Sequence, residues 1–255
     1  MLGSLLDALF PKRCAGCGEG PWPFCDRCRG EIVVLRPPWC GRCGAPAPRA
    51  VGTCRHCPPE PLVAARSPFL FEGPVRRAVH RLKFAGWRPV AEALGAAMAG
   101  SCDLSADAIT WVPLSRRRKA ARGFDQALAL ARAVAPRLDL PLMPLLRRGG
   151  DAGPQARRGG DERRRAMLDA FTATRTAPTR VLLVDDVLTT GATAAACASA
   201  LVAAGASEVS VLTAARAVSG AATDLYSTPG LRSGLWLPGE SLSGSRSQPR
   251  AKRPT

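Results

Sequence analysis

The sequence predicts an α/β protein whose mostly parallel sheet is preceded by a cysteine-rich module. Three observations lead to this prediction. Eight of the ten cysteines form four C-x2-C pairs within residues 14–57, helical and strand-like patterns alternate after the proline-rich stretch 58–61, and the run Val181–Val184 is entirely apolar. Such an apolar run is typical of a strand that is buried on both faces of a parallel sheet.

The paired cysteines have the spacing of ligands for two metal ions. A C-x2-C turn directs two sulfurs at one ion, and two such turns complete the tetrahedral shell of Zn²⁺. A disulfide framework would need an oxidising compartment, and residues 1–13 lack the basic start of an export signal. We expect two structural four-cysteine zinc sites, paired in sequence order or interleaved. Their ligands would be Cys14, Cys17, Cys25, Cys28, Cys40, Cys43, Cys54 and Cys57.

After the cysteine-rich module, hydrophobic periodicity alternates between the two regular patterns. Strand patterns are found at residues 69–71, 108–114, 181–184 and 209–214. Helical patterns are found at residues 75–84, 90–99, 126–134 and 193–204.

These patterns divide the chain into three parts. We expect a double zinc ribbon over residues 1–60, the α/β domain over residues 61–216, and a tail over residues 217–255. The tail is rich in Ser, Gly, Pro and Arg, so we expect it to be mostly disordered. No apolar run is long enough to cross a membrane, and the expected location is the cytoplasm.

An acidic pair follows the apolar run. Asp185 and Asp186 lead into a loop with hydroxyl and glycine residues, and a helical pattern follows. Ligands bind at the carboxyl ends of parallel strands, where loop N–H groups and the positive end of the next helix can hold a phosphate. The neighbouring acids then suit sugar hydroxyls, or Mg²⁺ shared with a sugar. No lysine follows a glycine, which excludes a P-loop, while an ordinary strand-turn-helix remains an alternative. The candidate phosphate-binding residues are Thr189, Thr190, Gly191, Ala192 and Thr193.

The segment 181–193 resembles the phosphoribosyl-pyrophosphate (PRPP) signature of type I phosphoribosyltransferases. With the paired cysteines and several separated motifs, the chain is similar over residues 10–216 to the ComF family, which includes GntX-type proteins and is linked to natural competence. The resemblance implies a type I phosphoribosyltransferase-like sheet flanked by helices. The motifs are Phe71–Pro74, His80–Phe84, Val112–Leu114 and Arg122–Gln126.

The resemblance also implies a function, namely PRPP binding and phosphoribosyl transfer to an acceptor that the sequence does not identify, in association with DNA uptake. Asp185 and Asp186 would contact the ribose hydroxyls, loop 189–193 would hold the 5′-phosphate, and Mg²⁺ would accompany the pyrophosphate. Lys83 and Arg122 would be catalytic cations that face the pyrophosphate. PRPP or a related phosphosugar is therefore the expected small-molecule partner. Asp125 departs from the family, which often has Asn there.

The positive charge of the chain is concentrated. Of a net +16, residues 116–165 contribute 14 basic against 5 acidic side chains. Pyrophosphate needs only a few cations, so the surplus favours a polyanion such as single-stranded DNA in addition, with pyrophosphate alone and a solvated basic face as the alternatives. Few aromatic side chains lie near this stretch in the sequence to stack against nucleobases, namely Trp111, Phe124 and Phe171. A second hypothesis is thus a non-catalytic DNA-handling protein built on this fold, with other competence proteins as further candidate partners.

Overall fold

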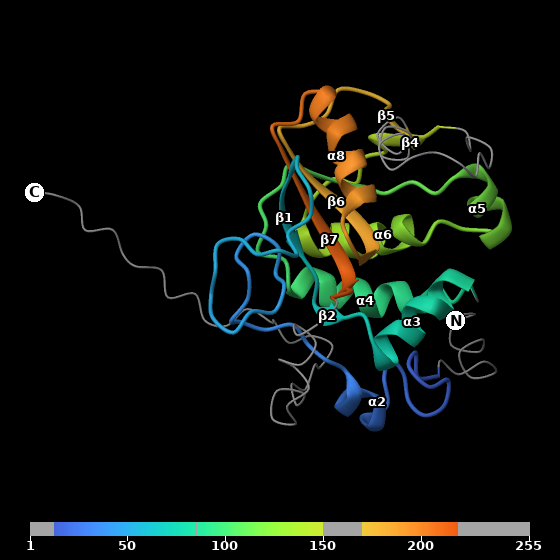
Figure 1. The fold of residues 1–255 in the computed structure, drawn as a ribbon. Coiled ribbons are helices and arrows are strands. Elements are labelled where there is room, and N and C mark those ends of the chain that lie inside the picture. The colour runs from blue at the N-terminus through green and yellow to red at the C-terminus, as the bar shows by residue number, and fades with distance from the viewer. Residues whose placement is uncertain (1–12, 85, 150–169, 219–255) are drawn as a thin grey trace, which may run out of the picture.

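The computed structural model describes residues 13–84, 86–149 and 170–218. Five parallel strands form one sheet in the order β1-β7-β6-β3, with β2 also paired to β7, and two further strands form an antiparallel pair (Figure 1). The mostly parallel α/β sheet predicted from the sequence is confirmed. The strands are β1 (Leu62–Arg66), β2 (Phe69–Leu70), β3 (Ala108–Trp111), β4 (Leu146–Arg148), β5 (Phe171–Ala173), β6 (Arg180–Leu188) and β7 (Glu208–Arg216).

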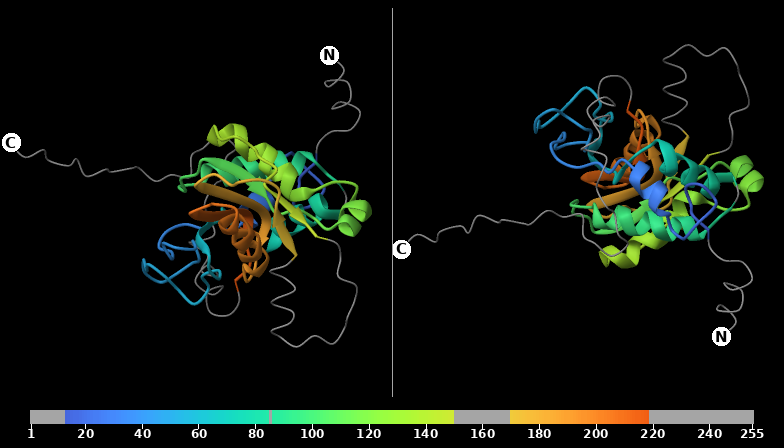
Figure 2. Two further views of the ribbon diagram at one scale, coloured as in Figure 1. Left: turned by 90° about the horizontal axis from the view of Figure 1, so that it is seen from above. Right: turned by 90° about the horizontal axis from the view of Figure 1, so that it is seen from below.

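Helices cover both faces of the sheet. Seen from above, α6 and α8 lie on opposite sides of it (Figure 2). Buried residues of α3, α4 and α6 form one core with one face of β6, and buried residues of α8 form a second core with the other face. The helices in the described part of the chain are α2 (Asp26–Glu31), α3 (Gly73–Phe84), α4 (Pro89–Gly100), α5 (Arg116–Arg122), α6 (Gln126–Leu138) and α8 (Ala192–Ala203).

The two cysteine-rich ribbons pack against different faces of the domain. Phe24 of the first ribbon is fully buried in the core that contains Val75 and Leu82 of α3. Ala45 of the second ribbon is fully buried in the core that contains Leu201 of α8. In Figure 1 the first ribbon accordingly lies below the sheet beside α2, and the second lies at the left beside β1. Each ribbon thus extends one of the two cores.

The structure corrects several predicted boundaries. The strand predicted at 181–184 continues to Leu188 because β7 pairs alongside it up to Leu188 and Arg216, so the acidic pair lies within β6 and not after it. Helix α6 runs on past the predicted end to Leu138, with Pro136 inside it. Strand β1 and helix α5 were not predicted. The sequence pattern of α5 gave no signal because none of its residues is buried.

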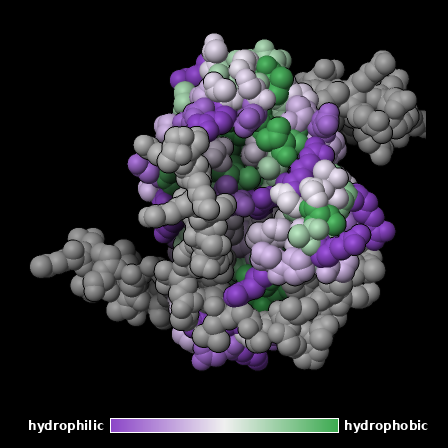
Figure 3. Space-filling model, turned by 90° about the vertical axis from the view of Figure 1, so that its left-hand side faces the viewer, coloured by the Kyte–Doolittle hydropathy of each residue, from purple (hydrophilic) through white to green (hydrophobic). Residues whose placement is uncertain are grey.

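The surface of the described residues is mixed. On the face drawn in Figure 3, small apolar patches lie among polar residues. In the described ranges, no helix is both long and apolar enough to cross a membrane. Large exposed apolar side chains include Val63, Phe84 and Val202, and Phe84 is 69% exposed. The predicted tail lies outside the described residues from position 219 onward.

Candidate functional site

Each cysteine quartet fits a zinc ion. Cys14, Cys17, Cys25 and Cys28 form one group and Cys40, Cys43, Cys54 and Cys57 the other, with the ligand atoms of each group within 4.8 Å of one another. The sulfur pairs Cys17–Cys25, Cys40–Cys57 and Cys43–Cys54 are 3.8, 3.6 and 3.6 Å apart. A disulfide would need about 2 Å, whereas a tetrahedral ion with Zn–S bonds of about 2.3 Å requires sulfurs about 3.8 Å apart. The expected four-cysteine sites are confirmed, and the pairing follows sequence order.

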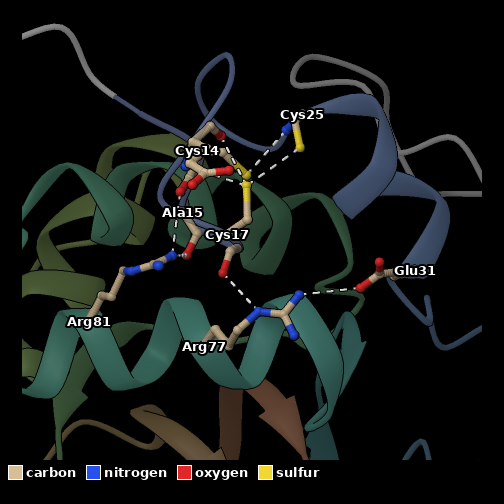
Figure 4. Close-up of polar contacts among 9 residues, drawn as sticks. Cys14, Ala15, Cys17, Cys25, Glu31, Arg77 and Arg81 are labelled. Carbon is tan, nitrogen blue, oxygen red and sulfur yellow. Dashed lines mark hydrogen bonds and ion pairs between the residues drawn. The ribbon is translucent and has the colours of Figure 1, made fainter.

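Two arginines of α3 hold the first ribbon. Arg77 donates to the Gly16 carbonyl at 2.8 Å and also pairs with Glu31, and Arg81 donates to the Ala15 carbonyl (Figure 4). The Cys14 sulfur in turn accepts a hydrogen bond from the Cys25 backbone N–H at 3.3 Å. Burial opposes ionisation of the Cys14 thiol, but backbone N–H donors outweigh it and lower its pKa to about 6. A thiolate at this position suits a zinc ligand.

A buried arginine joins the second ribbon to the end of β7. Arg216 is only 1% exposed, and its guanidinium donates to the carbonyls of Cys43 and His56. No described carboxylate lies within ion-pair distance of it. A buried cation needs a counter-charge, and four thiolates around Zn²⁺ carry a net charge of −2. The second zinc site therefore explains why an arginine can be buried here.

The acidic pair lies on β6 next to a lysine from α3. Asp186 is 5% exposed, and its Oδ1 atom forms an ion pair of 2.8 Å with Lys83 Nζ. Its other oxygen, Oδ2, is buried without a hydrogen-bond partner in the described part of the chain. A buried acceptor without a donor is costly, so this oxygen is suited to accept a hydrogen bond from a ligand hydroxyl.

The neighbouring residue, Asp185, is half-buried. Desolvation, with the charge of Asp186 as the second cause, raises the pKa of Asp185 to about 8. A hydrogen bond from the Asp186 backbone N–H to Asp185 Oδ1, 2.8 Å long, works in the opposite direction but does not outweigh burial. Two adjacent acids of this kind are characteristic of functional sites, where a ligand supplies the missing partners.

A loop rich in backbone donors follows the acids. Thr189 and Thr190 are exposed, and Gly191 adopts φ 79° as it begins α8 without a side-chain cap. The N–H groups in the first turn of a helix have no intrahelical partner, and together with the helix dipole they form an anion site. The loop and Asp185 line a hollow of about 60 Å³ that also reaches Thr213 of β7. The predicted phosphate-loop residues are therefore together, beside the acids.

The second ribbon also touches this loop. A Cβ atom added to Gly191 would lie 2.5 Å from Pro58 Cβ, and Pro58 directly follows the last zinc ligand, Cys57. The backbone approach therefore requires glycine both for its positive φ and for the absence of a side chain. Sequence reasoning took Pro58 only as part of a domain break, and it missed Arg216 altogether. The one feature of the sequence that could have indicated this contact is that Pro58 and Pro59 follow the zinc ligand Cys57 immediately.

The remaining predicted residues have other contacts. Arg122 lies over the Phe84 ring, 5.2 Å from its centroid, and no described contact joins it to the acidic pair. Asp125 caps α6 by accepting from the N–H groups of Ala127 and Leu128, and it also accepts from Leu114. Its role in capping explains an acid at this position. The arginines at 157–158 and 163–165 of the basic stretch lie outside the described residues.

The raised pKa of Asp185 predicts a pH-dependent stability. The folded chain keeps a proton that the unfolded chain loses near pH 4, so stability falls as pH rises from about 4 to about 8. Asp185→Asn should therefore stabilise the protein by about 1–3 kcal/mol at pH 8 and by only about a quarter of that amount at pH 5. Thermal unfolding at both pH values tests this, with the exposed Asp139→Asn as a control. An equal effect at both pH values would contradict it.

Comparisons with known proteins agree with the zinc sites. Residues 5–58 match the model of the double zinc ribbon domain family. Over 202 residues, the chain is 29% identical to DNA utilization protein YhgH of Salmonella typhimurium (strain LT2), a match that covers 74% of this chain and 88% of that relative.

Two solved structures have some similarity to the α/β domain. They are described as the allosteric regulatory enzyme of purine biosynthesis, with a TM-score of 0.37, and glutamine PRPP amidotransferase from B. subtilis complexed with ADP and GMP, with a TM-score of 0.36. Both are 25% identical over 48% of this chain, which spans a quarter of their length. With TM-scores this low, neither carries an argument about this chain.

Proposed function

We propose that this chain, whose double zinc ribbon and similarity to YhgH support a ComF-like family, binds PRPP and transfers its phosphoribosyl group. The observation that carries the proposal is the acidic pair on β6, in which Asp186 has a buried oxygen without a described partner, followed by the loop that begins α8. The acids would accept hydrogen bonds from the ribose hydroxyls, and loop 189–193 would hold the 5′-phosphate.

The reaction would be a substitution at the anomeric carbon. The bond from C1′ to the pyrophosphate oxygen breaks, pyrophosphate leaves with the electron pair, and the acceptor forms a new bond to C1′ and loses a proton. Asp185 and Asp186 would hold the ribose as positive charge develops on the ring. Mg²⁺, when bound with PRPP, would neutralise the leaving pyrophosphate. Lys83, which lies beside Asp186, would place a positive charge near the leaving pyrophosphate. Arg122 is a second candidate for this role.

Calorimetric titration with PRPP and Mg²⁺ tests this function. The wild type should bind PRPP at millimolar or lower concentration, and Asp185→Asn/Asp186→Asn should abolish the binding because each amide replaces one carboxyl oxygen with an NH2 group that cannot accept a hydrogen bond from a ribose hydroxyl. Asp139→Asn, which removes an exposed acid at the end of α6, should bind like the wild type. Absence of PRPP binding by the folded wild type would refute the proposal.

A second candidate function is the handling of single-stranded DNA, in line with the name of the YhgH relative. The observation that favours it is α5, a helix without buried residues that exposes Arg116, Arg117, Arg118 and Lys119. Cations displayed in this way are available to a polyanion. Binding of an oligonucleotide that persists in Asp185→Asn/Asp186→Asn and weakens steeply with salt would support this function in place of, or beside, transfer.

A further inference from the structure

A second cavity lies apart from the acidic pair. It has a volume of about 590 Å³ and is formed where the first ribbon meets α4, the end of α5 and the start of α6. We call it the ribbon groove. It shares no lining residue with the hollow at Asp185 and Thr189–Ala194. Its size is in the usual range of small-molecule sites. Its lining includes Trp22, Arg88, Glu92, Lys119, Phe124, Asp125, Leu128 and Arg132.

Two half-buried aromatic side chains line the ribbon groove. Trp22 belongs to the zinc-ligand loop between Cys17 and Cys25, and its ring packs against Trp87 with centroids 5.5 Å apart and planes at 59°. Phe124 lies in the connection between α5 and α6. The sequence alone placed Phe124 but not Trp22 near the basic stretch, because Trp22 comes from about a hundred residues earlier in the chain. Fixed aromatic surfaces of this kind suit the flat face of a nucleobase.

The free charge of the ribbon groove is positive. Arg88, Lys119 and Arg132 are exposed, and none forms an ion pair with a described acid. Its two acids are already engaged, because Glu92 pairs with Arg137 at 3.2 Å and Asp125 caps α6. Three exposed cations, none of them in an ion pair with a described acid, therefore face a cavity with aromatic walls, and the charge of Lys119 also acts on Asp125. This combination matches a ligand with a planar ring and a phosphate.

We propose that the ribbon groove binds a nucleotide, with its base against Trp22 and Phe124 and its phosphate near Arg88, Lys119 and Arg132. The nucleotide is either free or one unit of a single strand, since both present the same base and phosphate. The site is separate from the acidic pair, so it stands whether or not PRPP binds there.

Titration of the full-length, zinc-loaded chain with AMP, adenosine and ribose 5-phosphate tests the proposal. AMP should bind at least about tenfold more tightly than either fragment, because only AMP offers both groups. Failure of AMP to bind at millimolar concentration, or equal binding of ribose 5-phosphate, would overturn it. Competition between AMP and a short single-stranded oligonucleotide would identify a nucleic acid as the source of the nucleotide, and a lack of competition would identify the free nucleotide.

Matched variants locate the binding. Lys119→Ala/Arg132→Ala should weaken AMP binding about tenfold, whereas Arg116→Ala/Arg117→Ala removes the same charge from exposed positions outside the groove and should change it less than about threefold. Phe124→Leu keeps an apolar side chain and should weaken AMP but not ribose 5-phosphate. Equal effects of the two double variants would overturn the proposal.

A further variant separates this site from the proposed transferase site. Asp185→Asn/Asp186→Asn should leave AMP binding unchanged while it removes PRPP binding. Loss of AMP binding in that variant would place AMP at the acidic pair and overturn the proposal of a second site. Loss of PRPP binding alone would leave it intact.

Discussion

Replacing Cys54 with serine is expected to release one zinc ion and to disturb loop 189–193, whereas replacing Cys17 with serine should release one zinc ion and leave that loop in place. Both cysteines are half-buried ligands, one in each site, so the two variants are well matched. Structural zinc sites supply much of the folding free energy of small modules, and each variant should lose several kcal/mol of stability in its own ribbon.

The difference arises from what each ribbon touches. Pro58 follows the ligand Cys57 and packs against Gly191, and Arg216 connects the Cys43 and His56 carbonyls to the end of β7. Without thiolates around a metal, Arg216 would be a buried cation with no counter-charge, and the loss would spread from the ribbon to the sheet. The first ribbon instead packs on α3 through Arg77 and Arg81.

Two measurements check this expectation. Metal analysis should give two zinc ions in the wild type and one in each variant. Hydrogen exchange at residues 189–193 should accelerate only in Cys54→Ser, and PRPP binding, where present, should weaken at least about tenfold only there. If hydrogen exchange at residues 189–193 accelerates equally in both variants, the loop does not depend specifically on the second ribbon.

Local spacing explains which parts of the site could be predicted from the sequence. The zinc ligands and the residues from Asp185 to Thr193 are close in the chain, and their chemistry depends on neighbours two or three positions away. The paired cysteines were recognisable because one turn directs both sulfurs to one ion. The loop was recognisable because an apolar strand, acids, glycine and a helical pattern follow one another.

The remaining contacts depend on tertiary packing. Lys83 meets Asp186 from a helix about a hundred residues earlier, and Trp22 reaches a groove formed by α4 and α6. Strand β6 ends at Leu188 because its pairing with β7 extends that far. The residues 181–188 contain no local pattern that predicts this boundary. From the sequence alone, Arg216 would be expected to be an exposed charge at the end of a strand. In the structure the second ribbon covers it.

The ion pair between Lys83 and Asp186 provides the second large effect. Lys83→Met should destabilise the protein by about 3 kcal/mol, because it leaves a carboxyl that is 5% exposed without its cation. Arg76→Met removes an exposed cation from the same helix, one that forms no ion pair with a described acid, and should cost no more than about 0.5 kcal/mol. Denaturant unfolding of both variants at pH 7 measures the difference in the free energy of unfolding. Equal losses of stability would contradict the claim that the buried Lys83–Asp186 pair makes Lys83 the more important cation.

A double-mutant cycle isolates the pair itself. Asp186→Asn in the Lys83→Met background removes the stranded charge and should recover most of the lost stability, so the two substitutions should be strongly non-additive. Recovery of stability in the double variant would show that Lys83 stabilises the folded chain as the counter-ion of Asp186, whereas additive losses would contradict that role.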